Sequence, residues 1–230
     1  KFTYLKYFNS VWVPGVKQWQ YARKLGFKED HIFQGLYSCN LDLFENIFDK
    51  TFLKKKKIFP KKLLFIGRYT DSKGFNELSE LFIEIIEECN LNWELWCVGT
   101  GEQWENRKVH EKIKHLGFLQ PEELEDVILK TGVFVLPSKF EPWGVVLHEM
   151  VTSGMPILVS DQVGSMHTFL DNNVNGMSFS YTKKEDFKNK LLKFMHLSDQ
   201  ELLKMGEESV LLSKKITPVK WIEMLNQIYD

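Results

Sequence analysis

Several features that would each indicate a particular class of protein are missing from the sequence. It has three cysteines, Cys39, Cys89 and Cys97, and no CxxC pair, which excludes a disulfide scaffold and favours reduced thiols in a cytoplasmic setting. No apolar run approaches the ~18 residues that a membrane-spanning helix needs. The chain begins with Lys1 and has no apolar core or small-residue cleavage site of a signal peptide at its start. We therefore expect a cytoplasmic chain that is a piece of a longer protein.

An overall excess of charge is also missing, since 30 basic side chains stand against 31 acidic ones in 230 residues. The two parts of the chain differ, however: residues 1–62 hold 13 Lys or Arg and 5 Asp or Glu, whereas residues 63–230 hold 17 and 26. The basic excess is concentrated in Lys54–Lys57, Lys61 and Lys62. This run predicts an exposed linker, with contact to anionic lipid as the alternative. Nucleic-acid binding is not predicted, because the lysines are not interleaved with aromatic residues and the rest of the chain is acidic.

From residue 63 onward, short apolar runs alternate with longer amphipathic ones, which is typical of a parallel sheet with crossover helices. The expected strands are 63–67, 93–99, 133–137, 156–160 and 177–181, and the expected helices are 74–89, 121–130 and 144–154. Capping signals at Ser198 and Thr217 begin two further helices, which form a helical C-terminal tail. The predicted fold class is therefore α/β, with a Rossmann-like parallel sheet and helices on both of its faces over residues 61–230.

Residues 1–60 have a different organisation. The patterns predict a strand at 11–15, a helix at 18–27 and a strand at 31–40. We interpret this segment as the end of a preceding amino-terminal domain, followed by the linker to the domain at residues 61–230.

Polar residues follow the first three strands of the predicted sheet. In open α/β sheets, ligands bind beyond the carboxyl ends of the strands, so these loops are the candidate site. The loops are Gly67–Gly74, Gly99–Gly101 and Pro137–Gly144. Arg68 and Lys73 suit a diphosphate, because arginine holds phosphate oxygens in a fork, lysine supplies a point charge and a helix start adds free amides. Loop charges that serve only solubility are the alternative.

Two glutamates, Glu141 and Glu149, lie on either side of a predicted helix start, with seven residues between them. At ~1.5 Å of helical rise per residue their carboxylates would lie roughly 12 Å apart. Paired carboxyl groups of a glycoside hydrolase lie ~5 to 10 Å apart, so a hydrolase is disfavoured. The spacing suits two hydroxylated ends of one extended ligand, with a phosphate on the amides of residues 144–146 between them. The alternative is a helix first-turn charge at Glu141 and a surface residue at Glu149.

Other motifs give weaker signals. Gly99-Thr100-Gly101 is either a phosphate-loop fragment or a tight turn, since it lacks the third glycine of a dinucleotide site. Thr152 stands where a zinc-binding HExxH helix starting at His148 would have its second histidine, and His110 and His115 are five residues apart rather than four. No metal site is predicted.

Taken together, five segments resemble the carboxyl-terminal half of retaining glycosyltransferases of family 4, which have the GT-B fold. They are LLFIGRYTDSKGF, WELWCVGTGE, LGFLQPEEL, FVLPSKFEPWGVVLHEMVTSGMPILVSD and NNVNGMSF, and the resemblance covers residues 63–230. Its most specific mark is the pair of glutamates in EPWGVVLHE, in register with Arg68 and Lys73. The stretch from VWVPG to GLYSCNLDLF resembles the last segment of that family's amino-terminal domain.

The resemblance implies a role for each matched residue. Arg68 and Lys73 would bind the donor diphosphate, Glu141 would contact the donor sugar, and these three are the implied catalytic residues. Glu149 would bind the ribose. The loop of Phe118 and Leu119 would frame the base, with Leu124 beneath it. The complete implied donor-binding set is Gly67, Arg68, Lys73, Gly99, Thr100, Phe118, Leu119, Leu124, Ser138, Glu141, Pro142, Trp143, Gly144, Val145, Val146 and Glu149.

The activity implied by the resemblance is transfer of a sugar from a UDP or GDP sugar with retained configuration, without a metal or other cofactor. The implied role is polysaccharide or glycoconjugate biosynthesis, in the cytoplasm or at the inner face of the membrane. A sugar or lipid-linked acceptor would bind to the amino-terminal half, so this chain alone should bind the donor and scarcely catalyse. Residues 163–168 depart from the family, which often has a Gly-Gly turn and an acidic residue there, so no sugar contact is inferred from this loop. A non-catalytic module that binds a nucleotide or a protein is the alternative.

Overall fold

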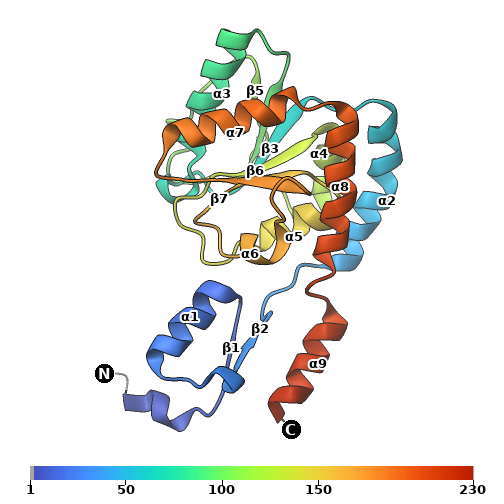
Figure 1. Cartoon of the computed structure of the whole chain (residues 1–230). Coiled ribbons are helices and arrows are strands. Elements are labelled where there is room, and N and C mark those ends of the chain that lie inside the picture. The colour runs from blue at the N-terminus through green and yellow to red at the C-terminus, as the bar shows by residue number, and fades with distance from the viewer. Residues whose placement is uncertain (1–2, 230) are drawn as a thin grey trace.

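A six-stranded, fully parallel sheet forms the centre of the computed structural model, which describes residues 3–229 (Figure 1). Its order is β5-β4-β3-β6-β7-β8. The strands are β3 (Lys62–Ile66), β4 (Glu94–Val98), β5 (Ile113–His115), β6 (Val133–Leu136), β7 (Ile157–Ser160) and β8 (Gly176–Phe179). All five predicted strands of this sheet are present within two residues of their expected ends. The edge strand β5 was missed, because three residues with the sequence IKH contain no apolar run.

Helices cover both faces of this sheet, as predicted. They are α2 (Leu41–Lys57), α3 (Phe75–Cys89), α4 (Leu124–Lys130), α5 (Val145–Thr152), the short α6 (Met166–Phe169), α7 (Lys184–His196) and α8 (Asp199–Ser213). Helices α3 and α7 pack on one face, and α2, α4 and α5 pack on the other. Short 3-10 turns, η3 (Asp71–Lys73) and η4 (Pro121–Glu123), lead into α3 and α4.

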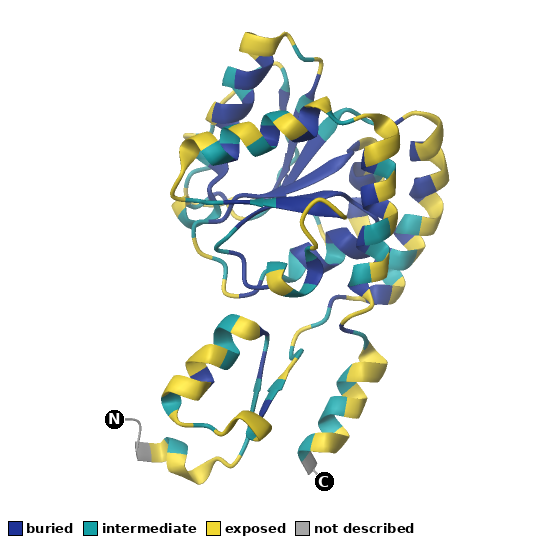
Figure 2. Ribbon diagram, in the orientation of Figure 1, coloured by how far each residue is buried: buried dark blue, intermediate teal, exposed yellow. Residues whose placement is uncertain are grey.

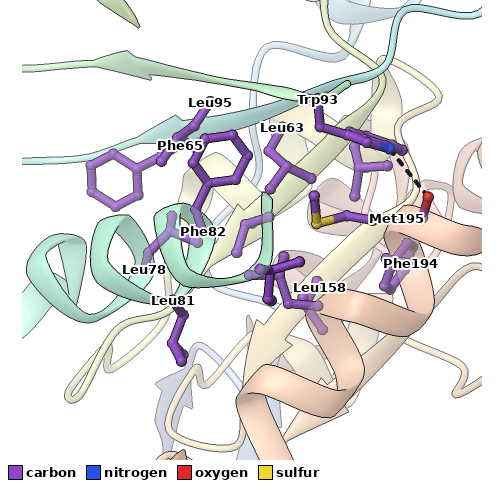
Figure 3. Packing of buried hydrophobic residues seen from close by; sticks show 14 of the residues in the cluster. Leu63, Phe65, Leu78, Leu81, Phe82, Trp93, Leu95, Leu158, Phe194 and Met195 are labelled. Carbon is purple, nitrogen blue, oxygen red and sulfur yellow. Dashed lines mark hydrogen bonds between the residues drawn. The ribbon is translucent and has the colours of Figure 1, made fainter. Parts of the chain in front are cut away.

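The alternation of side chains along each strand explains why both faces are apolar. On β3, Leu63 and Phe65 join the core under α3 and α7, whereas Leu64 joins the core under α4 and α5, and all three are 0% exposed. Figure 2 shows the strands as the most buried part of the chain, with exposed residues on the outer sides of the helices. In the first core, the indole of Trp93 also donates a hydrogen bond to the carbonyl of Met195 at 3.1 Å (Figure 3).

The predicted exposed linker at Lys54–Lys57 is wrong, because these residues form the last turn of α2. Phe44 and Ile47 belong to the core with α4 and α5, and Asn40 caps the start of α2 by accepting a hydrogen bond from Leu43 N. Lysines in a last helical turn also interact favourably with the helix dipole. Lys55 is only 4% exposed, and burial lowers its pKa to about 7. The prediction failed because it considered the lysine run by itself, whereas these lysines are the end of an amphipathic helix that begins 13 residues earlier.

The first part of the described chain forms a small separate sheet, which we call the N-terminal unit (residues 3–34). It contains η1 (Thr3–Tyr7), β1 (Val11–Val13), α1 (Val16–Leu25), η2 (Glu29–His31) and β2 (Ile32–Gln34), with β1 parallel to β2. The predicted strand at 31–40 ends at Gln34, because Gly35 has a φ of 90° and leaves the extended conformation. The unit has its own small core of Val13, Ala22 and Ile32.

The chain returns to the N-terminal unit at its end. Helix α9 (Pro218–Tyr229) lies beside β1 and β2 (Figure 1). The rings of Trp12 and Trp221 are 4.6 Å apart, and the indole of Trp221 donates to the carbonyl of Leu36 at 3.1 Å. Both predicted terminal helices are confirmed, including the capping box at Ser198.

Candidate functional site

The three loops that the sequence analysis selected meet at the carboxyl edge of the sheet. The loop after β3 is bonded to both of its neighbours: Tyr69 N donates to Thr100 O at 3.0 Å, and Lys139 N donates to Ser72 O at 2.8 Å. Gly99 fits against this loop, since a side chain at Gly99 would meet the carbonyl oxygen of Gly67 at 2.0 Å. The fold therefore brings polar groups from β3, β4 and β6 to one place.

Lys73 and Glu141 form an ion pair at the centre of this edge. The two residues lie 68 positions apart in the chain, and their side chains are only 17% and 12% exposed. The backbone of Glu141 is also fixed, because its carbonyl accepts a hydrogen bond from Gly164 N at 2.9 Å. Water and salt screen the attraction in a partly buried pair of this kind less than in a pair on the surface.

The helix that follows Glu141 is shorter than predicted. Helix α5 begins at Val145, and Glu141 lies before it in a bridge to Val163, so it is not a helix first-turn charge. The helical rise therefore applies only from Val145 onward, and the ~12 Å separation of the two glutamates stays a prediction.

Arg68 is exposed, and its guanidinium makes no hydrogen bond or ion pair with any residue in 3–229. It lies two residues beyond β3, whereas Lys73 closes the same loop. A free arginine and a partly buried lysine in one loop provide two cationic groups for an anionic ligand.

Glu149, on the second turn of α5, is not a surface residue. It is partly buried, and this burial raises the pKa of its carboxyl group to about 7. Within the described part of the chain its side chain has no hydrogen-bond or ion-pair partner. A partly buried carboxyl group without a partner is costly to the fold, which makes a ligand-binding role reasonable.

The start of α5 offers free backbone amides beside Glu141. Gly144, at the N-cap, has a φ of 87°, and no side chain among the described residues caps this end. No acidic residue stands in the first turn, where Val145 and Val146 are partly buried. Free amides and the helix dipole at such an end favour an anionic group.

The other residues of the expected donor site take different positions. Thr100 and Pro142 are exposed on their loops. Ser138 is 0% exposed, and its hydroxyl has no hydrogen-bond partner among residues 3–229. Trp143 is 4% exposed and its ring packs against Phe169, so the side chain is buried beneath the loop surface.

The expected base-binding residues lie beside β4. Gly99 N donates to Gly117 O at 2.7 Å, which fixes the loop of Phe118 and Leu119 to the end of β4. Phe118 is 65% exposed, Leu119 is partly buried, and Leu124 is 3% exposed in the core beneath.

Lys139 is a site residue that the sequence analysis missed. Its ammonium group contacts Asp71 and Glu77, each at 2.6 Å. Burial alone would lower the pKa of Lys139, but the hydrogen bonds to these two carboxylates outweigh it and raise the pKa. Through Asp71, Lys139 thus ties the loop after β6 to the loop that contains Arg68 and Lys73. No local pattern could have identified it, because its partners, Asp71 in the loop after β3 and Glu77 on α3, are distant in the sequence.

The N-terminal unit also reaches the site, a contact that no sequence pattern indicated. The side chain of Gln18 donates to the carbonyl of Pro142 at 2.7 Å, and Lys17 donates to the carbonyl of Asp161 at 2.9 Å. A side chain at Gly15 would meet the ring of Trp143 at 2.5 Å. The first turn of α1 therefore rests on the loop that holds Glu141.

Residues 163–168, where the sequence departs from the resembled family, support the same loop. Ser165 N donates to Trp143 O at 3.0 Å, and its hydroxyl donates to Gly144 O at 3.1 Å. Over residues 3–229, no three His, Cys, Asp or Glu side chains gather as they would around a metal ion. Nor does any described helix combine the length and hydropathy needed to cross a membrane.

Replacing Gly74 with alanine should destabilise the site more than an ordinary loop change. Gly74 has a φ of 68°, and an added Cβ would lie 2.1 Å from the carbonyl oxygen of Pro137. Strain and clash together should cost about 2 kcal/mol or more of unfolding free energy. Gly117→Ala is the matched control, because its φ is 73° but nothing lies within 4 Å. Chemical denaturation should show a loss of only about 1 kcal/mol for the control; equal losses would show that the contact with Pro137 is unimportant.

Comparison with known proteins places this chain in a family. Residues 44–209 match the family described as Glycosyl transferases group 1. An uncharacterized glycosyltransferase of Methanocaldococcus jannaschii, MJ1607, is 32% identical over 133 residues, which cover 55% of this chain and 33% of that protein. The chain spans about a third to a half of the length of the curated relatives it matches first.

Solved structures share the fold. A glycosyltransferase of Rickettsia africae has a TM-score of 0.75 at 17% identity, with 100% of this chain and 68% of that chain covered. The Anabaena protein HepE, solved in complex with UDP and glucose, has a TM-score of 0.71 at 14% identity, with 95% and 62% covered. At these identities the likeness concerns the fold, which is that of the carboxyl-terminal domain of GT-B glycosyltransferases.

Proposed function

Because the chain belongs to the group 1 glycosyltransferases, we propose that it is the donor-binding half of an enzyme that transfers a sugar from a nucleoside diphosphate sugar to an acceptor, with retained anomeric configuration as in family 4. The division of the chain into residues 1–60, the end of the amino-terminal domain, and residues 61–230, the donor domain, is part of this proposal.

The observation that carries the proposal is the ion pair of Lys73 with Glu141. It lies beside Arg68 and the start of α5, neither of which has a side-chain partner within residues 3–229. A donor diphosphate needs cations and amides, and a donor sugar needs an acceptor for its hydroxyl hydrogen bonds. In the proposed complex, Lys73 and Arg68 bind the phosphates, and Glu141 accepts hydrogen bonds from the sugar close to the bond that breaks. The same cations then stabilise the charge that develops on the leaving diphosphate.

The implied nucleotide end of the donor lies further along the same edge. In the proposed complex, Glu149 accepts hydrogen bonds from the ribose hydroxyls, and the loop of Phe118 and Leu119 binds the base. UDP is supported by the HepE structure, which holds UDP, and GDP is equally compatible with the residues. We further propose that transfer needs no metal, since Arg68, Lys73 and the helix amides already provide positive charge at the phosphates.

The remainder of the proposal concerns the whole protein. We propose that a sugar or lipid-linked acceptor binds mainly to the amino-terminal half, so that this chain alone transfers little, and that the enzyme acts in the cytoplasm in polysaccharide or glycoconjugate biosynthesis. The end of α2 is a candidate surface for peripheral contact with a membrane, because Leu53 and Ile58 are 68% and 83% exposed beside Lys54 and Lys57.

Calorimetric titration of the protein with UDP, GDP and ADP tests the donor site. We expect one nucleoside diphosphate to bind selectively, with the same affinity in EDTA. Arg68→Ala should weaken binding roughly tenfold, because a charged hydrogen bond to phosphate is lost. Arg23→Ala, at the end of α1, is the control and should leave the affinity unchanged. Binding of none of the three nucleotides would contradict the proposed function, and loss of binding in EDTA would contradict the metal-free site.

A further inference from the structure

His148, in the middle of α5, lies where two chain segments connect the large sheet to the rest of the protein: it contacts one of them and the residue that directly precedes the other. We call these segments the two connections: residues 35–40, between β2 and α2, and residues 214–217, between α8 and α9. The ring is 0% exposed and stacks on Phe169, with centroids 4.2 Å apart and an angle of 16°.

One ring nitrogen of His148 is hydrogen-bonded to Cys39, inside the first connection, and the other to Ser213, the residue directly before the second connection. Nδ1 accepts a hydrogen bond from Cys39 N at 3.2 Å, and Nε2 donates to the carbonyl of Ser213 at 3.0 Å. A backbone N–H can only donate and a carbonyl can only accept, so the contacts require the neutral ring with its proton on Nε2. Burial keeps the ring neutral by lowering its pKa to about 4.

The parts beyond the two connections are joined to each other. The indole of Trp221 on α9 donates to the carbonyl of Leu36, and its ring lies against Trp12 of β1. The N-terminal unit and α9 therefore form one body, and both connections run from this body to the large sheet (Figure 1). His148 is hydrogen-bonded to the chain where the two connections reach the large sheet.

Helix α5 is also the element that carries the proposed donor groups. Its first turn begins beside Glu141, and Glu149 directly follows His148. A second contact strengthens the attachment, since the hydroxyl of Thr152 lies 3.6 Å from the sulfur of Cys39. At the other end of the interface, Gln18 and Lys17 rest on the loops of Pro142 and Asp161. Two groups of contacts, those of α5 with Cys39 and those of Lys17 and Gln18, therefore fix the orientation of the N-terminal unit relative to the proposed donor residues.

We propose that His148 is a positioning residue that fixes the N-terminal unit and α9 relative to the donor residues of α5, and thereby sets the rate of sugar transfer. This inference rests on the proposed function, in which the acceptor binds mainly to the amino-terminal half of the protein. A residue with this role should affect the transfer step while nucleotide binding, which uses the large sheet alone, is preserved.

Three substitutions separate the two hydrogen bonds. His148→Phe keeps the stacking on Phe169 and removes both bonds. His148→Asn places an oxygen near the position of Nδ1 and retains the bond from Cys39, whereas His148→Gln places an amide nitrogen near Nε2 and retains the bond to Ser213. Thr131→Val is the control, since it removes a buried hydroxyl that donates to the carbonyl of Val127 on α4, away from both connections.

The measurements, made on the intact enzyme, are kcat and KM for the donor, affinity for the nucleoside diphosphate, amide hydrogen exchange of residues 36–41, and small-angle scattering. We expect His148→Phe to lower kcat at least tenfold with nucleotide affinity changed less than about threefold. Exchange of residues 36–41 should be faster, and the scattering profile should differ from that of the wild type. His148→Asn should restore slow exchange, and Asn and Gln should each recover part of kcat.

Either of two results would overturn the proposal. A His148→Phe enzyme with wild-type kcat would show that the contacts do not matter for transfer. Equal losses of kcat, nucleotide affinity and thermal stability would show a packing role alone. If the wild-type enzyme transfers no sugar from any nucleotide sugar, the proposed function fails, and the scattering comparison then decides the orientation role of His148: a changed profile supports it and an unchanged one refutes it.

Discussion

Replacing Glu141 with glutamine in the intact enzyme should lower kcat for sugar transfer at least about a hundredfold. The substitution keeps the size of the side chain but removes the negative charge that pairs with Lys73 and is proposed to bind the donor sugar. Groups aimed at the charge of a transition state in a partly buried site typically contribute this much. Steady-state kinetics with the donor identified by calorimetry measures the effect, and the far-ultraviolet circular dichroism should be unchanged.

The control for Glu141→Gln is Glu125→Gln, which breaks an ion pair with Lys50 whose side chains are 42% and 48% exposed. Because exposed pairs contribute little, this variant should keep wild-type kcat and stability. Lys73→Ala should reduce transfer as severely as Glu141→Gln, and the double variant should lose little more, since the two residues act together. If Glu141→Gln retained kcat within about threefold of the wild type, the proposed role of Glu141 would be wrong.

Replacing Glu149 with glutamine should have two opposite effects above pH 7: a more stable protein and weaker nucleotide binding. Burial raises the pKa of Glu149 from an ordinary 4.5 to about 7, so the folded chain binds a proton at Glu149 more tightly than the unfolded chain does. The stability contributed by this group is therefore present at low pH, decreases as the pH rises from 4.5 to 7, and stays lost above that. Glutamine avoids this loss.

The stability difference between Glu149→Gln and the wild type should be near zero at pH 4.5 and rise to about 1 to 3 kcal/mol above pH 7. Denaturant unfolding at a series of pH values measures it. Only the difference between the two proteins is informative, because His148 has the opposite dependence: its lowered pKa of about 4 makes its contribution disappear as the pH falls from 6.5 to 4.

Glu122→Gln, at an exposed position before α4, is the control and should show no pH-dependent difference. Nucleotide affinity of Glu149→Gln should fall roughly tenfold, since a carboxylate bonds ribose hydroxyls more strongly than an amide does. A variant that is less stable than the wild type at pH 8 would contradict the partial burial of Glu149 without a side-chain partner among the described residues.

The sequence alone determined five of the six strands of the large sheet and the edge that carries the candidate site. Runs such as Leu63–Phe65 and Val133–Leu136 are apolar at every position, and in a parallel sheet covered on both faces such runs have no other place than the core. Once these strands are parallel, the loops that follow them must gather at one edge, so the order of strands and loops was enough to select Arg68, Lys73 and Glu141. Capping at Ser198 was equally readable, because it depends on residues three positions apart.

Only the tertiary structure decided how these residues interact. The pairing of Lys73 with Glu141 and that of Lys139 with Asp71 each join residues 68 positions apart, and no local pattern records such contacts. Nor does the sequence show that Lys55 is buried where α2 packs on the domain, or that Glu149 is partly buried with no side-chain partner among residues 3–229. Periodicity and capping arise from forces between near neighbours in the chain, whereas burial and charge pairing depend on which distant segments pack together, and that is settled only when the whole fold closes.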